Sequence, residues 1–423
     1  MEKLLEFVQN NLQANTARLI LDRSKWPDID MDIAVNCIES RNKLKGKIRE
    51  WYDNPYLVFP LKLSAEQCSS SLTGLYKSEL AERIAGFIDS WKLADLTGGL
   101  GVDSWYFSKK AGQVLYCEMQ KALCDAAQHN FAALGSGNIM VRNCMVVPKN
   151  AADSQSIGLE TSPDELFAEY TPDIIYLDPA RRGEGGRKVF LLEDCTPDIL
   201  KLKDELFTCA RHILIKLSPM ADITMVCERL GRCCREVHVV GASGECKELL
   251  VWMDREWNGD YTITAVELCG TENECESALF SFSPSEERSS APLIAGKDDI
   301  TDAAYLFEPG KALMKAGAYN LISARFGLKK LGRSTHYYVA SETSDSFKKL
   351  GKVFNILKCE SLDKRSIKEI ASAYPKAEVT ARNLQMDTDT LRKKLGTRSS
   401  DQFHIFGLKS DTAGNLLLAT ERQ

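Results

Sequence analysis

The chain has 423 residues, of which 44% are hydrophobic and 27% charged, as is ordinary for a soluble globular protein of two or three domains. No apolar run approaches the roughly 20 residues that span a bilayer, and the acidic, amphipathic start lacks the features of a signal peptide, so we expect a cytoplasmic protein with no membrane partner. The net charge of −5 is unusual for an enzyme of nucleic acids, although local patches set the field at a cleft.

Residues 1–70 are predicted to form an N-terminal helical domain. Apolar residues recur at helical spacing between residues 4 and 20, and residues 31–51 form a longer pattern of the same kind. Asn54-Pro55 and Phe59-Pro60 interrupt the helices, and Ser64 to Gln67 resembles a capping box. A helix over 74–90 is then expected to lead into the first strand.

Residues 71–258 alternate between strand and helix patterns. The predicted strands are buried apolar runs, near residues 91–95, 114–118, 138–142, 173–177, 211–217, 235–241 and 248–253. The clearest later helices cover 191–209 and 222–230. Alternating βα units imply a parallel sheet with right-handed crossovers. We therefore predict an α/β fold with a Rossmann-like, seven-stranded sheet.

A glycine turn follows the first predicted strand. It reads Asp95-Leu96-Thr97-Gly98-Gly99-Leu100-Gly101, and a helix follows it. Glycines let the backbone approach a ligand closely, and open α/β sheets bind nucleosides at such turns. The third glycine of the dinucleotide-binding pattern is missing, so a pyrophosphate cradle is not expected.

Polar residues also end the other predicted strands of this sheet. Glu118, with Met119 beside it, ends the second strand 23 residues after Asp95, where a carboxylate can accept hydrogen bonds from ribose hydroxyls. Asn143 follows the third strand and is placed to reach an adenine ring. Asp178-Pro179-Ala180-Arg181 ends the fourth strand. One edge of the sheet thus gathers groups suited to a nucleoside.

From residue 261 the pattern changes to mixed α and β elements, typical of a small α+β domain. Strands are expected near 261–268, 279–282, 337–340, 353–358, 378–381, 403–408 and 415–419, and helices near 311–326, 366–373 and 388–394. Residues 283–297 are expected to be a loop. The most basic stretch contains Arg325, Lys329, Lys330 and Arg333, with aromatic residues nearby, as in surfaces that contact phosphates and bases. A solvated charged face is the alternative.

The sequence resembles class I S-adenosylmethionine (SAM)-dependent methyltransferases over roughly residues 64–255, on the residues Asp95 to Gly101, Glu118, Asn143 and Asp178 to Arg181. It is also similar to bacterial methyltransferases with a C-terminal ferredoxin-like and THUMP-like part, on Tyr76-Lys77, the segments 177–181 and 307–310, and the segment 382–395. The resemblance implies SAM as cofactor, a methyltransferase domain over 71–258, a ferredoxin-like segment over 259–322 and a THUMP-like domain over 323–423.

The same resemblance implies roles for individual residues. Those implied to bind the cofactor are Asp95, Thr97, Gly98, Gly99, Gly101, Glu118, Met119, Asn143 and Asp178. Those implied to act in catalysis are Asp178, Pro179 and Arg181. Those implied to bind the substrate are Tyr76, Lys77, Arg181, Arg182, Arg325, Lys329, Lys330 and Arg333. For the arginines at 181 and 182 a solvated loop is an equally good interpretation, as is packing of Tyr76 beside a surface Lys77.

Structured RNA, ribosomal or transfer, is the expected substrate, because THUMP modules accompany RNA-modifying enzymes. Uridine C5 methylation is disfavoured, since Leu217 stands where that chemistry needs a cysteine nucleophile. A small-molecule or protein methyltransferase and a SAM- and RNA-binding module without catalysis remain alternatives. No metal is expected, because the 14 cysteines and 5 histidines contain no Cys-x-x-Cys pair and no spaced histidine pair.

Overall fold

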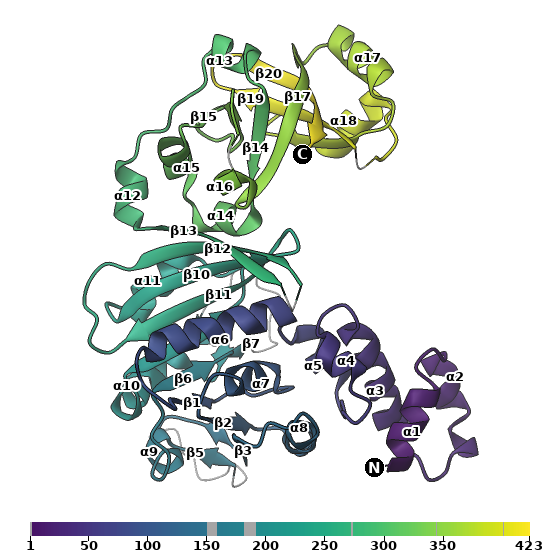
Figure 1. Ribbon diagram of the computed structural model, residues 1–423, viewed down its shortest axis with the longest axis vertical. Helices are drawn as coiled ribbons and strands as arrows, with labels where there is room; N and C mark the ends of the chain where they lie inside the picture. The colour runs from purple at the N-terminus through teal and green to yellow at the C-terminus, as the bar shows by residue number, and fades with distance from the viewer. Residues whose placement is uncertain (1, 150–158, 182–191, 272–273, 344, 401) are drawn as a thin grey trace. The chain divides into compact units, whose positions relative to one another are not determined.

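A computed structural model describes residues 2–149, 159–181, 192–271, 274–343, 345–400 and 402–423 (Figure 1). By its internal contacts the chain divides into two compact units. The first comprises Met1–Val237, Glu248–Asp260 and Cys269–Cys275, and the second comprises His238–Lys247, Tyr261–Leu268 and Glu276–Gln423. Among the described residues, no helix is both long and apolar enough to cross a membrane.

The first unit begins with short helices. They are α1 (Glu2–Asn10), α2 (Thr16–Leu21), α3 (Met31–Leu44), α4 (Arg49–Asp53), α5 (Lys62–Gln67) and α6 (Ser71–Ala85). The helix expected over 31–51 is wrong in its length, because α3 ends at Leu44 and a turn separates it from α4. The capping box expected at Ser64 is also wrong, since Ser64 lies inside α5. The box begins at Ser70, which caps α6 by exchanging hydrogen bonds with Thr73.

These N-terminal helices share a hydrophobic core with two helices of the α/β part, α7 (Val102–Ser108) and α8 (Lys121–Ala133). Trp51 of α4 packs edge-on against Trp105 of α7, with 5.8 Å between the ring centroids. In the same core, Tyr116 and Phe131 contact edge to face at 5.5 Å. This aromatic packing lies directly behind the glycine turn.

The central sheet confirms the predicted α/β class. Its hydrogen-bonded order is β13-β12-β10-β11-β9-β6-β1-β2-β3 (Figure 1). The bounds are β1 (Lys92–Asp95), β2 (Gln113–Glu118), β3 (Ile139–Asn143), β6 (Ile174–Leu177), β9 (His212–Leu217), β10 (Cys234–Ala242), β11 (Glu245–Asp254), β12 (Thr262–Gly270) and β13 (Cys275–Phe282). The seven strands predicted for the methyltransferase sheet are all present, and β12 and β13 extend it to nine.

The strands β3, β2, β1, β6 and β9 pair in parallel, whereas β11 is antiparallel to β9. The parallel strands therefore end at one edge of the sheet, where the predicted site residues lie. The remaining elements of this part are β4 (Met145–Val146), β5 (Glu160–Thr161), α9 (Pro163–Leu166), β7 (Ala180–Arg181), a 3-10 turn η2 (Leu192–Asp194), β8 (Cys195–Thr196), α10 (Ile199–Cys209) and α11 (Ile223–Leu230).

The second unit contains a seven-stranded sheet in the order β15-β16-β14-β17-β20-β19-β18. Its strands are β14 (Tyr305–Pro309), β15 (Lys329–Lys330), β16 (Tyr338–Ala340), β17 (Gly351–Ser361), β18 (Glu378–Arg382), β19 (Phe403–Ser410) and β20 (Gly414–Arg422). The helices described around it are α12 (Pro284–Ser289), α13 (Lys297–Thr301), α14 (Lys311–Ala316), α15 (Tyr319–Phe326), α16 (Asp345–Lys348), α17 (Lys364–Ala373) and α18 (Thr388–Leu395).

Two expectations for this unit are wrong in detail. The single helix expected over 311–326 is split, because Gly317 adopts a left-handed conformation with φ 86° and ends α14. The loop expected over 283–297 contains the helix α12, which begins with a capping box between Ser283 and Glu286. Proline at the first position of that helix starts it rather than breaking it.

Candidate cofactor and catalytic site

The turn after β1 is organised by Asp95, which is buried at the end of that strand. Its Oδ1 accepts a hydrogen bond from the Thr97 amide at 3.0 Å, and its Oδ2 accepts one from the Ser104 hydroxyl at 2.6 Å. Burial raises the pKa of the Asp95 carboxyl to about 7, against the opposing effect of these two donors. Asp95 therefore shapes the turn from inside the protein.

The three glycines of the turn differ in what a Cβ atom at each position would contact. A Cβ on Gly98 would lie 2.1 Å from the Tyr116 ring, and one on Gly101 would lie 2.7 Å from the Phe131 ring. Gly99, with φ 53°, would carry a Cβ that meets nothing closer than 3.8 Å. Gly98 and Gly101 thus make room for the aromatic core, whereas Gly99 has open space in front of it.

The carboxylate of Glu118 is held by backbone amides at the end of β2. Its Oε2 accepts from the Gly99 amide at 2.9 Å, and its Oε1 accepts from the Gln120 amide at 2.7 Å. The residue is only 7% exposed. Each carboxylate oxygen can accept more than one hydrogen bond, so both keep capacity for further donors.

Asn143 lies at the end of β3, beside the end of β2. Its amide nitrogen donates to the carbonyl oxygens of Glu118 and Met119, at 2.7 and 3.1 Å. These contacts fix the orientation of the side chain and leave its Oδ1 as an acceptor. The Met119 side chain is half exposed and supplies apolar surface at the same place.

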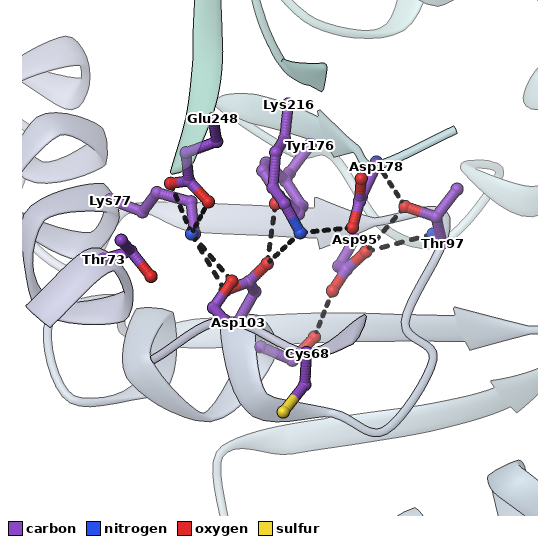
Figure 2. Close-up of polar contacts among 12 residues, drawn as sticks. Cys68, Thr73, Lys77, Asp95, Thr97, Asp103, Tyr176, Asp178, Lys216 and Glu248 are labelled. Carbon is purple, nitrogen blue, oxygen red and sulfur yellow. Dashed lines mark hydrogen bonds and ion pairs between the residues drawn. The ribbon is translucent and has the colours of Figure 1, made fainter. Parts of the chain in front are cut away.

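Asp178, directly after β6, is held at two points (Figure 2). Its backbone amide donates to Thr97 Oγ1 at 2.6 Å, and its Oδ2 accepts from Lys216 Nζ of β9 at 2.5 Å. Burial alone would lower the pKa of Lys216, but the carboxylates of Asp178 and Asp103 outweigh it and raise that pKa. Lys216 is therefore a buried ammonium group.

A second buried ammonium belongs to Lys77 of α6, which is fully buried (Figure 2). Its Nζ donates to both carboxylate oxygens of Glu248, at 2.7 and 3.0 Å, and to Ser69 Oγ at 2.9 Å. The same Nζ lies 3.3 Å from Asp103 Oδ1. Burial opposes ionisation of Asp103, yet Lys77 and Lys216 hold its pKa at about 2.

The structure gathers the residues predicted to bind the cofactor at one edge of the sheet. They lie at the ends of β1, β2 and β3 or directly after β1, β2 and β6, and are Asp95, Thr97, the three glycines, Glu118, Met119, Asn143 and Asp178. Tyr76 and Pro179 are buried, and Lys77 is committed to the ion pairs described above. For Arg181 the structure describes only the backbone, in β7, and Arg182 lies outside the described residues.

The predicted basic stretch lies in the second unit, and most of its charges have local partners. Arg325 pairs with Glu286, and Lys329 pairs with Asp299. Lys330 is buried and donates to the Arg333 carbonyl at 3.0 Å. Arg333 is exposed, and its backbone amide donates to Asp411. Their assignment to substrate binding stays a prediction.

Lys216, Asp103 and Glu248 were not predicted as site residues from the sequence. Lys216 interrupts the apolar run of β9, and Glu248 directly precedes the buried Leu249 of β11. A lone charged residue in or beside a buried strand could have indicated these residues, because charged side chains are rarely buried without a partner. Within the described ranges, no group of three or more histidine, cysteine or acidic residues is arranged to hold a metal ion.

The sequence matches two families in its C-terminal part. Residues 305–347 match a ferredoxin-like domain, and residues 351–422 match a THUMP domain-like family. The ferredoxin-like match overlaps both the 259–322 and the 323–423 segments of the predicted division, whose boundaries stay predictions. No curated protein matches the chain.

Among solved structures, the chain is similar to a presumed methyltransferase from Porphyromonas gingivalis W83. The identity is 28%, the match covers 99% of this chain and 97% of that one, and the TM-score is 0.81. Partial matches include an rRNA methylase from Streptococcus thermophilus (10% identity, 42% and 94% of the two chains, TM-score 0.28). Another is the 16S rRNA N2 G1207 methyltransferase from T. thermophilus in complex with AdoMet and guanosine (14% identity, 46% and 45%, TM-score 0.30).

These matches confirm the predicted methyltransferase-like fold and the predicted ferredoxin-like and THUMP-like C-terminal part. The protein has the fold of the methyltransferase-like P. gingivalis protein over nearly its whole length, and it carries ferredoxin-like and THUMP-like domains at its C-terminal end.

Proposed function

We propose that the protein transfers a methyl group from SAM to RNA. The observation that carries the cofactor part is the placement of Glu118 between the amides of Gly99 and Gln120, with the Asn143 Oδ1 acceptor beside it. A fixed carboxylate suits the two hydroxyl donors of a ribose, and an amide oxygen suits the amino group of adenine. Met119 supplies the apolar surface that an adenine ring needs.

The glycine turn fits SAM better than a dinucleotide. The Gly98 amide donates to the Cys117 carbonyl, the Gly101 amide to the Gly98 carbonyl, and the Gly99 amide to Glu118. These backbone donors are therefore used inside the protein and do not form a cradle for a pyrophosphate. SAM has no phosphate, and the open side of Gly99 allows the close approach that it requires.

When bound, SAM supplies a methyl group that is already activated by its sulfonium. The protein then has to hold the acceptor in line with the methyl group and exclude water. Asp178 is the predicted catalytic residue best placed for this, because Thr97 ties its backbone to the glycine turn. Its side chain is 39% exposed, so an acceptor can reach it.

The RNA part of the proposal rests on the THUMP-like match and on the distribution of charge. Residues 323–423 contain 19 lysines and arginines against 11 acidic residues, a net charge of +8. The rest of the chain has a net charge of −13. A positive domain attracts the phosphate backbone, while the acidic remainder accounts for the overall net charge.

The cofactor is tested by isothermal titration with SAM and with S-adenosylhomocysteine. Wild type is expected to bind both, and Glu118→Gln is expected to weaken binding by about 1–3 kcal/mol, as for a lost charged hydrogen-bond acceptor. Asp125→Ala, an exposed carboxylate on α8, is the control and should bind like wild type. Absence of binding to wild type would refute the cofactor assignment.

The acceptor is tested by incubating the protein with SAM labelled in its methyl group and extracts from cells that lack the gene. Label in the RNA fraction is expected. Label in protein or in small molecules would instead favour the alternative that the overall acidic charge suggests. Binding of SAM with no transfer to any fraction would favour a module that binds but does not catalyse.

A further inference from the structure

Five charged side chains form a continuous alternating series at the carboxyl edge of the sheet (Figure 2). In order they are Glu248, Lys77, Asp103, Lys216 and Asp178, contributed by β11, α6, α7, β9 and the end of β6. The successive nitrogen-to-oxygen distances are 2.7, 3.3, 3.8 and 2.5 Å. We call these five residues the charge chain.

The charge chain is almost completely buried except at one end. The side chains of Lys77, Glu248, Asp103 and Lys216 are 0%, 4%, 10% and 13% exposed, whereas that of Asp178 is 39% exposed. The series contains three carboxylates and two ammonium groups. With all five ionised, one negative charge is unbalanced, and Asp178 is the only member that solvent or a substrate reaches freely.

Stability alone does not account for such an arrangement. Removing several charges from water costs more than their mutual attraction commonly returns, and apolar residues of the same volume often serve stability as well or better. Clusters of buried titratable groups that reach an exposed side chain are instead common at functional sites. The charge chain ends beside the glycine turn, because Thr97 Oγ1 accepts the hydrogen bond of the Asp178 amide.

The two carboxylate oxygens of Asp178 have different surroundings. Oδ2 accepts a hydrogen bond from Lys216. Lys216 also lies near Asp103 Oδ2, and that oxygen accepts a hydrogen bond from the Tyr176 hydroxyl at 2.7 Å. Among residues that the structure describes, none donates a hydrogen bond to Oδ1. One oxygen is thus fixed from inside, and the other is available to an acceptor.

We propose that Lys216 is a positioning residue that holds Asp178 so that its second oxygen takes a proton from the acceptor nitrogen or oxygen. This inference rests on the proposed methyl transfer and specifies its acceptor. The nucleophile's lone pair forms a bond to the methyl carbon, and the carbon–sulfur bond breaks with its electron pair passing to the sulfonium sulfur. The N–H or O–H proton passes to Asp178. The proposed acceptor is therefore an amino or hydroxyl group. A thioether has no proton to give, and C5 methylation of uridine needs the cysteine nucleophile that Leu217 replaces.

The test combines product analysis with variants, using the full-length protein and bulk RNA from cells that lack the gene. Labelled RNA is digested to nucleosides, and N-methyl or O-methyl products are expected. Asp178→Asn should reduce kcat by about 10²–10⁴-fold, as for loss of a general base. Lys216→Met should reduce kcat at least about tenfold with little change in KM for RNA, and Lys216→Arg should restore part of the loss.

Two measurements separate positioning from a structural role. SAM affinity and thermal midpoint are determined for each variant, and Lys201→Met, an exposed lysine on α10, is the control. A Lys216→Met enzyme that is folded, binds SAM like wild type and has lost kcat supports the proposal. An unchanged kcat in Lys216→Met or in Asp178→Asn would overturn it.

The products also distinguish this inference from the function on which it rests. A carbon-methylated nucleoside would overturn the inference and leave the methyltransferase proposal intact. In the extract experiment, N- or O-methylation of protein would support the inference and overturn RNA as acceptor. Transfer to no fraction would overturn both.

Discussion

Gly98 and Gly99 are neighbours in one turn, yet they meet different surroundings. The α-carbon of Gly98 faces the ring of Tyr116, where a Cβ would lie 2.1 Å from a ring carbon. Gly99 has φ 53° and open space on the side of its missing Cβ. The first glycine is required by packing, and the second by backbone conformation and, as proposed, by the approach of SAM.

The two glycines are therefore expected to respond differently to alanine. Gly98→Ala should lower the free energy of unfolding by about 1–3 kcal/mol or more, because the Tyr116 ring must move. Gly99→Ala should lower the free energy of unfolding by only about 1–2 kcal/mol, the cost of the left-handed conformation. When only folded protein is compared, Gly99→Ala should weaken SAM binding more than Gly98→Ala does. Urea unfolding and isothermal titration measure the two effects, and the reverse order of effects would contradict this interpretation.

Asp95 gives the same turn a dependence on pH. Its folded pKa of about 7 is higher than the value near 3.9 of an unfolded chain, and burial is the main cause. Below pH 4 the group is protonated in both states. Between pH 4 and 7 the unfolded state has lost the proton and the folded state keeps it, so the free energy of unfolding falls as pH rises. Above pH 7 the folded state has also released the proton, and this contribution to stability is lost.

The Asp95→Asn variant, which does not titrate, should reveal this contribution. The unfolding free energy of wild type relative to the variant should decrease between pH 4 and 8, by up to about 4 kcal/mol for a shift of some three pH units. Groups that do not interact with Asp95 cancel in the difference between the two proteins, whereas Asp103 and Asp178 interact with it. Denaturant unfolding at several pH values provides the measurement, and a difference that is constant across this range would refute the assignment.

At the scale of elements, the parallel strands of the central sheet were predictable because each contains a short apolar run, and polar residues stand at or just after the ends of β1, β2, β3 and β6. Asp95 and Glu118 end β1 and β2, Asp178 directly follows β6, and parallel pairing brings these strand ends together. The charge chain was not predictable in this way. Lys77 and Glu248 are 171 residues apart, and for Lys77 the sequence suggested substrate binding or, as an alternative, a surface position, but no ion pair.

Local patterns were also insufficient where tertiary contacts or single residues decide an element's ends. The pattern over 311–326 is helical throughout, and only the left-handed Gly317 divides it. Ser64 is followed by acidic and amide residues as in a capping box, but the exchange of hydrogen bonds occurs at Ser70 and Thr73. Sequence alone does not show which of two candidate caps the packed helix will use.

The packing of α6 on α7 yields a prediction at this scale. Gly74 lies inside α6, where replacement by alanine ordinarily stabilises a helix by about 1 kcal/mol. Here a Cβ would lie 2.3 Å from the Tyr106 ring of α7. Gly74→Ala is therefore expected to destabilise the protein, by about 1–3 kcal/mol. Glu79→Ala, at an exposed position of α6, is the control, and a stabilising Gly74→Ala in urea unfolding would contradict the observed packing.

At the scale of the whole molecule, the separation of charge between the two parts of the sequence is the main feature. Residues 323–423 carry a net charge of +8 within a chain of −5 overall. Exposed lysines at 364 and 368 on α17, and at 393 and 394 on α18, have no ion-pair partner among the residues that the structure describes. These two helices contact one another, so under the proposed function we expect their unpaired charges to contact a phosphate backbone.

The double variant Lys393→Glu/Lys394→Glu tests this placement. If both lysines neutralise phosphates, RNA affinity at low salt should fall about tenfold or more, and the slope of log affinity against log salt should decrease by about 1–2. SAM affinity should stay the same, because no residue proposed to contact SAM lies on α18. Lys3→Glu on α1, also exposed but outside this region, is the control. Fluorescence anisotropy with a structured RNA at several salt concentrations gives the affinity and its salt dependence. An unchanged slope would show that Lys393 and Lys394 do not contact RNA phosphates.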